Sequence, residues 1–247
     1  MNDIIFKVEY GGLGDHLFYS PLPRLLKLYG MANKVYISSS SNFRSWGTYA
    51  FVWGKNPYLD GISDDKPFDK MNADVGEKKI VNIIMSEYGL VGLGKEINPE
   101  IYVDIPINEI YAKKKYLDMN YISYVGGYTP YDEYIIIRKH PELVLVNPSK
   151  RMLQLHENPY VYTKSIVDYA SLIYSAEEFW CLASGGASLS AALNKQANVF
   201  YAYGQNEVFH HSINYHHKVG SSGMMRRILA KFYYKKNKIR VAKSKNK

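Results

Sequence analysis

The sequence predicts an α/β protein with parallel sheets, and three observations support this prediction. Apolar runs at residues 4–10 and 34–38 are typical of buried strands. Between them, Gly11-Gly12-Leu13-Gly14 interrupts the chain, and leucines within residues 15–29 supply the apolar face of a helix. A second strand, glycine turn and helix follow at residues 179–193. Strand, turn, helix and strand in this order are typical of a parallel sheet.

The second unit repeats the pattern of the first. Residues 179–183 are predicted as a buried strand, Ser184-Gly185-Gly186 as the turn, and residues 187–193 as a small-residue helix. Each turn would present backbone N–H groups at a helix start, at the carboxyl edge of a sheet, where open α/β folds bind ligands. Such a helix start binds phosphate or another anion. Glycine also occurs in turns for its backbone freedom alone, so both interpretations stay open.

The rest of the chain is expected to form shorter elements around a linker. Pro21 and Pro23 predict an irregular first turn for the helix at 15–29. An extended linker at 99–106 divides the chain into domains at 1–105 and 106–223, followed by a basic tail at 224–247. Strands are expected at 61–63, 79–85, 121–125, 134–138, 143–146 and, as the last, 198–203, and helices at 108–119 and 165–175.

Composition indicates a globular protein of ordinary kind. The chain has 247 residues, of which 47% are hydrophobic and 22% charged, so it can bury a proper core and is neither a disordered linker nor a collagen. Cys181 is its one cysteine, which excludes an intramolecular disulfide. No apolar run approaches the ~20 residues of a membrane span, and the first residues lack the features of a signal peptide. We therefore expect a cytoplasmic protein.

The net charge of +8 comes from the C-terminal tail. Residues 226–247 contain ten basic and no acidic residues, which leaves 21 basic against 23 acidic residues, a net of −2, in the rest. Nucleic acid is not an expected partner, because nucleic-acid-binding domains spread basic residues over the fold. Met225, Ile228, Leu229 and Phe232 share one helix face. We expect an anionic membrane surface as partner, or else a docked terminal helix with a solvated end. The membrane contacts would be Arg226, Arg227, Lys231, Lys235 and Lys236.

Several motif-defined functions are excluded. The first glycine turn lacks the third glycine of the dinucleotide fingerprint, and the strand at 34–38 ends in serines, with no acidic residue for a ribose. Neither a P-loop nor the G-x-S-x-G of hydrolases is present. The histidines at 210–217 lack carboxylates or cysteines at ligand spacing, so no metal is expected. We expect them to line a cleft and help neutralise phosphate, or else to lie on the surface. Asp15 at the mouth of a sheet suits a general base or a positioning carboxylate.

The first glycine turn and its helix resemble the opening of the ADP-heptose lipopolysaccharide heptosyltransferases and their relatives in glycosyltransferase family 9. The matching residues are Gly11-Gly12-Leu13-Gly14-Asp15-His16-Leu17, Ser20-Pro21 and Leu25-Leu26-Lys27. Asn56-Pro57-Tyr58-Leu59-Asp60 is similar to the family's N-P-Y-I-D element. Residues 184–193 are similar to its D-T-G-x-x-H-L-A-A-A-L element, and the three elements occur in the family's order.

The resemblance implies a GT-B fold, with two Rossmann-like domains facing a cleft. It also implies an inverting, metal-independent sugar transfer from a nucleotide-sugar donor, without a cofactor, to a glycan or glycolipid acceptor at the inner membrane face. Asp15 would be the base. The acceptor-side loop would contain Gly12, Gly14 and His16, and the donor diphosphate would lie on Ser184, Gly185, Gly186 and Ser188.

The chain also departs from the family's pattern. It is shorter than a usual two-domain member, and residues 121–162 are compressed, which predicts a reduced second domain. Ser184 stands where the family has Asp, and Ser188 or Leu189 where it has His. Our first hypothesis is a glycosyltransferase of bacterial lipopolysaccharide, lipooligosaccharide or capsule synthesis, peripheral to the cytoplasmic membrane. The alternative is a catalytically inactive relative that acts as a membrane-bound binding or scaffold protein. A third hypothesis is an RNA-associated protein with a basic tail.

Overall fold

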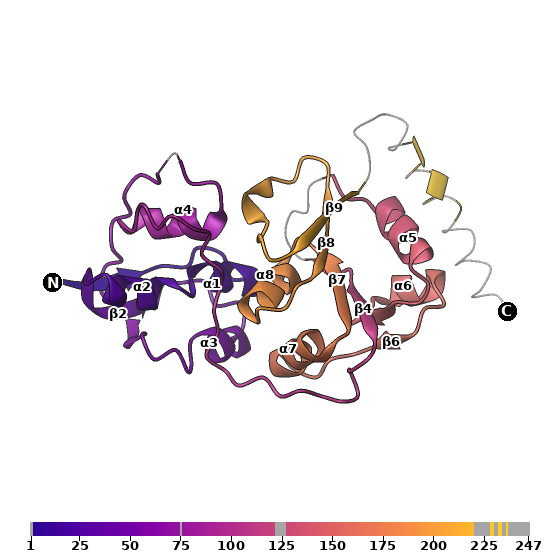
Figure 1. The fold of residues 1–247 in the computed structure, drawn as a ribbon, viewed down its shortest axis with the longest axis horizontal. Helices are drawn as coiled ribbons and strands as arrows, with labels where there is room; N and C mark the ends of the chain where they lie inside the picture. Colours follow the sequence, from indigo (N-terminus) through magenta and orange to yellow (C-terminus); the bar gives the residue numbers. More distant parts are fainter. Residues whose placement is uncertain are drawn as a thin grey trace.

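Two parallel sheets form the framework of the molecule (Figure 1). The computed structural model describes residues 2–74, 76–121 and 127–219, and residues 228–229, 232–233 and 236. The first sheet has the strand order β1-β2-β3, with β1 at Asn2–Phe6, β2 at Ala32–Ser38 and β3 at Gly61–Ser63. The strands at 34–38 and 61–63 are thus confirmed, whereas the first strand ends at Phe6.

The helix expected at 15–29 is two helices, α1 at Leu13–Tyr19 and α2 at Leu22–Leu28. Pro21 has no N–H to continue α1, so α2 starts afresh with Pro23 in its first turn. The Ser20 hydroxyl between them donates to the Leu17 carbonyl at 2.7 Å. The prolines thus divide the expected helix in two, which is a larger effect than an irregular first turn.

The expected strand at 79–85 is wrong, because this segment forms helix α4 at Ile80–Glu87. Val81, Ile84, Met85 and Tyr88 are all buried. Their spacing of i, i+3, i+4 and i+7 is that of one helix face. We also predicted no helix at the position of α3 (Trp46–Val52). Its N-cap residue is Ser45, whose hydroxyl accepts a hydrogen bond from the Thr48 amide at 3.2 Å.

The second sheet has six parallel strands in the order β6-β5-β4-β7-β8-β9. Its earliest strand in the chain, β4, therefore lies inside the sheet. The strands at 143–146, 179–183 and 198–203 are confirmed as β5, β7 and β8, but β8 is not the last strand, because β9 follows. The strands are β4 (Lys115–Asp118), β5 (Val144–Val146), β6 (Tyr160–Val161), β7 (Glu178–Leu182), β8 (Asn198–Ala202) and β9 (Tyr215–Val219).

Four helices of the described chain accompany this sheet, and a short 3-10 helix, η1 (Glu207–Phe209), precedes β9. The helix at 165–175 is confirmed as α7, and the small-residue helix as α8. Two expectations are wrong. Residues 108–119 contain β4 instead of a helix, and 134–138 lie in α5, whose start is capped by Thr129 and Asp132. The helices are α5 (Pro130–Lys139), α6 (Lys150–Leu155), α7 (Ile166–Ser175) and α8 (Gly185–Ala192).

The helices of the second sheet lie in two layers. Buried residues of α5 and α6, such as Ile137 and Met152, form one apolar cluster with Leu117 and Leu145 of the sheet. Leu172 of α7 and Ala187 and Leu189 of α8 belong to a different cluster. The predicted α/β fold with parallel sheets is thus confirmed. A reduced second domain stays a prediction; in the described residues the second sheet has six strands and the first has three.

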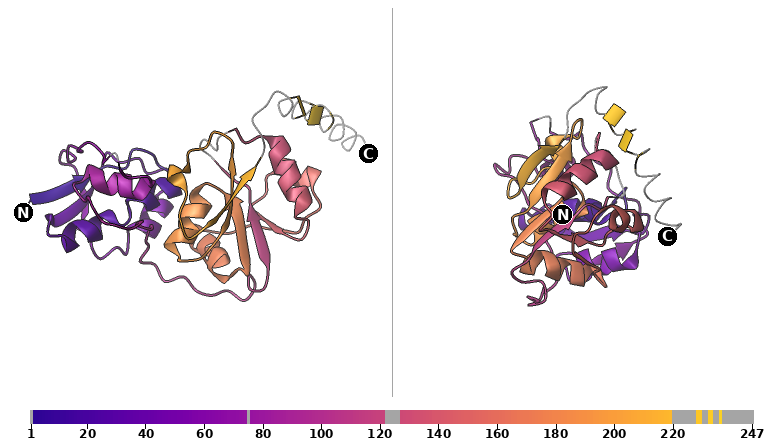
Figure 2. Two further views of the ribbon diagram at one scale, coloured as in Figure 1. Left: turned by 45° about the horizontal axis from the view of Figure 1, so that its top comes forward. Right: turned by 90° about the vertical axis from the view of Figure 1, so that its right-hand side faces the viewer.

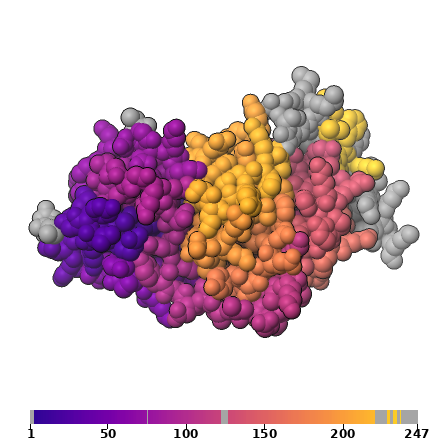
Figure 3. Space-filling model, in the orientation of Figure 1, coloured from indigo at the N-terminus to yellow at the C-terminus, as the bar shows by residue number. Residues whose placement is uncertain are grey.

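The cluster on the α7 and α8 side continues into the first sheet. It joins Phe6 and Leu17 of the N-terminal part to Phe179 and Leu189 of the C-terminal part. The two parts lie side by side, joined by an extended connection, and their surfaces meet without a visible gap (Figures 2 and 3). The connection is fixed near its start at Glu100, whose amide donates to the Ser20 hydroxyl at 2.8 Å.

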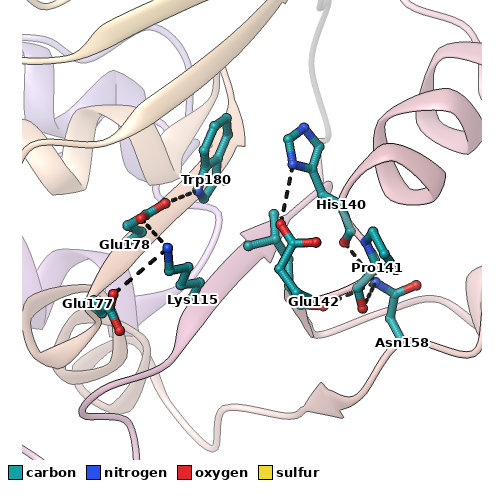
Figure 4. A network of polar contacts seen from close by, with 9 residues as sticks. Lys115, His140, Pro141, Glu142, Asn158, Glu177, Glu178 and Trp180 are labelled. Atoms are coloured by element: carbon teal, nitrogen blue, oxygen red, sulfur yellow. Dashed lines mark hydrogen bonds and ion pairs between the residues drawn. The ribbon is translucent and has the colours of Figure 1, made fainter.

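The edge of the second sheet where its strands begin, opposite the glycine turns, is polar (Figure 4). Lys115 at the start of β4 contacts Glu178 at the start of β7, and the Trp180 indole donates to Glu178 at 2.9 Å. Asn158 donates to the carbonyls of the turn before β5, including that of His140 at 3.1 Å. These contacts lie at the amino ends of the strands, so they fix the sheet away from the glycine turns.

The predicted tail lies largely outside the described residues. Of the expected membrane contacts, Arg226, Arg227, Lys231 and Lys235 are not described, and Lys236 is helical and exposed. The residues at 122–125 of the strand expected at 121–125 also lie outside, and Tyr121 is not in a strand. Within the described part of the chain, no helix has the length and apolar character needed to cross a membrane.

Candidate functional site

The two glycine turns meet in space. Helix α1 packs against helix α8, although the helices follow strands of different sheets (Figure 1). A Cβ atom on Gly14 would lie 3.4 Å from the Gly185 Cα and 3.6 Å from the Ser188 Oγ. A Cβ on Gly185 would lie 3.5 Å from the Gly14 nitrogen. The missing side chains therefore let the backbones of two helix starts approach to van der Waals contact.

Asp15 lies in the first turn of α1, beside this contact. Its Oδ2 accepts a hydrogen bond from the Gly12 amide at 2.9 Å, which fixes the carboxylate and leaves Oδ1 outside that bond. The side chain is half-buried, and burial raises the pKa of Asp15, although the Gly12 amide and the charge of Arg44 oppose the shift. A fixed, half-buried carboxylate with a raised pKa is what a general base requires.

Gly12 and Arg44 shape the surroundings of that carboxylate. A Cβ on Gly12 would lie 2.7 Å from the Asp15 Oδ2, so any side chain there would displace the carboxylate. The same Cβ would lie 3.9 Å from the Arg44 Nη1. The guanidinium of Arg44 thus lies over the turn, and it supplies the positive charge next to Asp15.

The ring of His16 lies behind the turn, in the core, and not on the acceptor side where we expected it. His16 is fully buried. The Trp53 indole donates to its Nδ1 at 3.0 Å, so Nε2 carries the proton and donates to the Asn42 carbonyl at 3.0 Å. Burial lowers the pKa of His16. Both nitrogens are therefore engaged, and the side chain supports the turn from beneath.

The second turn offers free backbone donors. Ser184 is the N-cap residue of α8, but its side chain makes no capping hydrogen bond. Among the hydrogen bonds of the described residues, none uses the amide of Gly185 or Gly186. Ser188 differs from our expectation, because it is buried and lies 3.2 Å from the His211 Nε2. Ser188 thus faces a histidine of its own part of the chain.

A buried carboxylate lies beneath Gly186, and the sequence analysis missed it. Asp118 at the end of β4 accepts from the Tyr169 hydroxyl and from the Asn120 amide, the latter at 2.8 Å. Burial raises the pKa of Asp118, and it raises that of Tyr169 as well. A Cβ on Gly186 would lie 2.5 Å from the Tyr169 Oη, so this position requires glycine. Assigning residues 115–118 as a strand would have placed Asp118 at the carboxyl edge, beside the turn.

Three histidines form a cluster next to α8, which we call the histidine cluster: His210, His211 and His216. His210 and His211 are buried, and His216 is partly exposed. The rings of His210 and His216 stack at 4.1 Å between centroids. Burial lowers the pKa of each of the three to about 4, so at neutral pH they carry no charge. Neutral imidazoles cannot neutralise a phosphate, which corrects the expectation that they line a cleft for that purpose.

The histidine cluster also bridges the two parts of the chain. Lys79 at the start of α4 donates to the His210 carbonyl at 2.9 Å, and the Ser212 amide donates to Glu96 at 2.9 Å. Phe18 of α1 contacts the ring of His211, with 6.0 Å between centroids. In the described residues, no group of three or more His, Cys, Asp or Glu side chains is placed to bind a metal ion. Metal-independent chemistry stays a prediction.

Solved structures have the same overall fold. No protein-family model and no curated protein sequence matches the chain. A glycosyltransferase family 9 protein from Veillonella parvula superposes with a TM-score of 0.60 at 8% identity, over 95% of this chain and 89% of that one. The chain has the fold of the family 9 glycosyltransferases.

Two proteins of Escherichia coli have the same fold. ADP-heptose lipopolysaccharide heptosyltransferase II matches with a TM-score of 0.53 and 11% identity, over 90% of this chain and 92% of that one. TibC, an iron-containing dodecameric glycosyltransferase, matches with a TM-score of 0.60 and 13% identity over 90% of this chain. The chain spans 64% of the length of TibC. Identities this low concern the fold, and the fold is the one that the sequence resemblance implied.

Proposed function

We propose that the chain is an inverting, metal-independent glycosyltransferase. It would move a sugar from a nucleotide-sugar donor to an acceptor of bacterial surface glycan, such as lipopolysaccharide, lipooligosaccharide or capsule, at the cytoplasmic membrane face. The observation that carries this proposal is the contact between the two turns: the turn that holds the fixed carboxylate of Asp15 meets the turn with the free amides of Gly185 and Gly186 through the Gly14 and Gly185 backbones. One turn carries a base and the other carries anion-binding groups.

In the proposed reaction, the first turn activates the acceptor and the second turn binds the leaving group. Asp15 takes the proton of an acceptor hydroxyl through Oδ1 while the acceptor oxygen attacks the anomeric carbon of the donor. The bond to the nucleoside diphosphate breaks on the opposite face, which inverts the anomeric centre. The leaving diphosphate gains negative charge, which the amides of Gly185 and Gly186 stabilise at the start of α8. Ser184 would donate to the same oxygens, and its partial exposure and lack of a capping bond support this role.

Contact with an anionic membrane is part of the proposal. Ile228, Leu229 and Phe232 were predicted to share the apolar face of a helix, and they are 42%, 42% and 66% exposed. Tyr233, by contrast, packs on Tyr134 of α5, with 4.7 Å between ring centroids. A helical segment that contacts α5 through one side and leaves apolar residues exposed supports insertion into a membrane surface.

The test of the catalytic proposal is Asp15→Asn. Asparagine can still accept the Gly12 hydrogen bond, so the fold and donor binding should survive, whereas loss of a general base lowers kcat by about 10²–10⁴-fold. The matched control is Asp132→Asn, since Asp132 occupies the same first-turn position in α5 and accepts from the Thr129 amide at 2.8 Å. If Asp15→Asn shows unchanged turnover with an identified donor and acceptor, Asp15 is not the general base.

Donor binding is tested first, by thermal shift with ADP, GDP, UDP, CMP and their sugar conjugates. A ligand that binds only the native state stabilises it by about 2.7 kcal/mol at a hundredfold excess over Kd. One selective shift supports a donor site and names the nucleotide. Replacing Ser184 by Ala should weaken that shift without changing the melting temperature of the free protein, because the Ser184 side chain makes no capping bond.

A catalytically inactive binding or scaffold protein is the second candidate, and two observations favour it. The backbones of Gly14 and Gly185 are already in contact, so a diphosphate fits only beside this contact or after the turns part. Ser188 faces His211 and not a ligand. Absence of any nucleotide shift in a folded sample, together with retained vesicle binding, would select this candidate.

A further inference from the structure

A column of aromatic rings runs from the core to the surface beside Asp15. It starts at Trp53, which is buried and bonded to His16. The ring of Phe43 stacks on His16, with 5.3 Å between centroids and 19° between planes. The indole of Trp46 stacks on Phe43 in turn, at 5.8 Å and 10°. Each ring is thus supported by the one beneath it.

The last ring of the column, the indole of Trp46, is fixed in orientation and exposed to solvent. Tyr49 meets the Trp46 indole edge to face, at 5.2 Å and 90°, and it meets Phe43 in the same way at 5.4 Å. These contacts set the plane of the indole, because Phe43 covers one face and Tyr49 meets it at a right angle. Trp46 is nevertheless 67% exposed. An oriented indole with a free face offers a flat apolar surface to a ligand.

This surface lies at the rim of the candidate site. Trp46 follows Arg44 by two residues, and the Arg44 guanidinium lies over the turn that fixes Asp15. A Cβ on Gly47, next to Trp46, would lie 3.8 Å from Ile166 at the start of α7, so this end of α3 borders the second part of the chain. The exposed indole of Trp46 thus belongs to the same short segment as Arg44, the cation whose charge acts on Asp15.

We propose that Trp46 is the stacking platform for the acceptor sugar, and that Arg44 binds its polar groups. This inference rests on the proposed function, and it names the acceptor as a pyranose with one apolar face. The axial C–H groups of such a ring pack on an indole, since they expose carbon and hydrogen on one side while the hydroxyls point outward. Arg44 has five N–H donors for hydroxyl or carboxylate oxygens. A sugar on Trp46 and Arg44 presents a hydroxyl toward Asp15.

The test uses saturation-transfer NMR with methyl glycosides of glucose, galactose, mannose and N-acetylglucosamine at millimolar concentration. We expect at least one glycoside to bind, with the strongest transfer to the axial protons of one ring face. Trp46→Ala should weaken its binding about tenfold or more, equal to about 1.4 kcal/mol, and Trp46→Tyr should restore part of it. Arg44→Ala should weaken binding without changing which protons receive saturation.

Tyr29→Ala is the matched control. Tyr29 is 57% exposed, but it lies between α2 and β2, at the amino edge of the first sheet, and its loss should leave glycoside binding unchanged. Absence of transfer to all four glycosides, or equal transfer in Trp46→Ala, would overturn the inference. The thermal shift with nucleotides reports on donor binding at α8 alone. If Trp46→Ala keeps this shift, failure of the acceptor-site inference can be told apart from failure of the proposed function.

Discussion

Acid should weaken the contact between the two parts of the chain through the histidine cluster, and His211 allows a worked case. His211 is 2% exposed, and burial lowers its pKa from 6.5 to about 4, with contributions from His216, Lys79 and His210. The unfolded chain therefore takes up a proton on this residue at a higher pH than the folded chain does. Stability is full above pH 6.5 and falls as the pH drops toward 4.

The magnitude follows from the pKa shift. At pH 5, which is 1.5 units below the pKa of 6.5, His211 is protonated in the unfolded chain and almost fully neutral in the folded chain. At 1.36 kcal/mol per unit, the free energy of unfolding is therefore lower by about 2 kcal/mol. His210 and His216 add to this cost, because burial lowers the pKa of each to about 4 as well. Glu96 is the acidic group that faces His216 and opposes the effect.

The assay is urea denaturation of wild type and His211→Gln at pH 7.5 and pH 5. Glutamine can keep the contact with Ser188, so the variant should lose about 1 kcal/mol at pH 7.5, mainly from packing on Phe18. Its further loss between pH 7.5 and 5 should be smaller than that of wild type by about 2 kcal/mol. His140→Gln, at a histidine outside the cluster, is the control. Equal losses in wild type and His211→Gln would refute the reasoning.

Two further predictions concern the glycines and the tail. Gly186→Ala should lower the free energy of unfolding by about 1–3 kcal/mol, because its Cβ would lie 2.5 Å from the Tyr169 Oη. Gly47→Ala, in exposed α3 with its nearest neighbour 3.6 Å away, should instead raise it by about 0.5–1 kcal/mol; urea denaturation of both variants checks the opposite signs, and equal signs would contradict the packing argument. Deleting residues 226–247 should abolish sedimentation with anionic vesicles while leaving the far-UV circular dichroism of the sheets intact, since each basic residue near such a surface contributes about 1 kcal/mol. Vesicle binding that persists in the deletion variant would disprove a membrane role for the tail.

The elements that the sequence predicts well are those whose local signal agrees with their packing. Strand β2 and helix α7 are continuous apolar or amphipathic segments with clear ends, as at Ser165, whose hydroxyl caps the Asp168 amide at 3.1 Å. Segments 79–85 and 134–138 are short and rich in isoleucine or valine, which favours a strand locally. Their helical form comes from burial of one face against the core, so tertiary contacts decide it.

The site shows the same division. Asp15 and the turn at Gly185 follow from short local motifs, and the resemblance to known enzymes adds their roles. The contact of Gly14 with Gly185 depends on how the two sheets face each other, and the position of Asp118 beneath Gly186 depends on the pairing of β4 with β7. Single-sequence patterns carry no information on that arrangement. Trp46 gave no motif at all, because exposure and ring geometry define it.

The apolar cluster that both sheets share sets an order of events during synthesis. The chain leaves the ribosome from its N-terminus, so Phe6 and Leu17 emerge long before Phe179 and Leu189, their partners in the same cluster. At about 5–20 residues per second, that delay lasts on the order of 10–30 s. For this time the first sheet exposes apolar surface that residues of the second part, including those of α8 and β7, later cover. We therefore expect the nascent N-terminal part to be a client of chaperones, and the two sheets of the finished protein to unfold together.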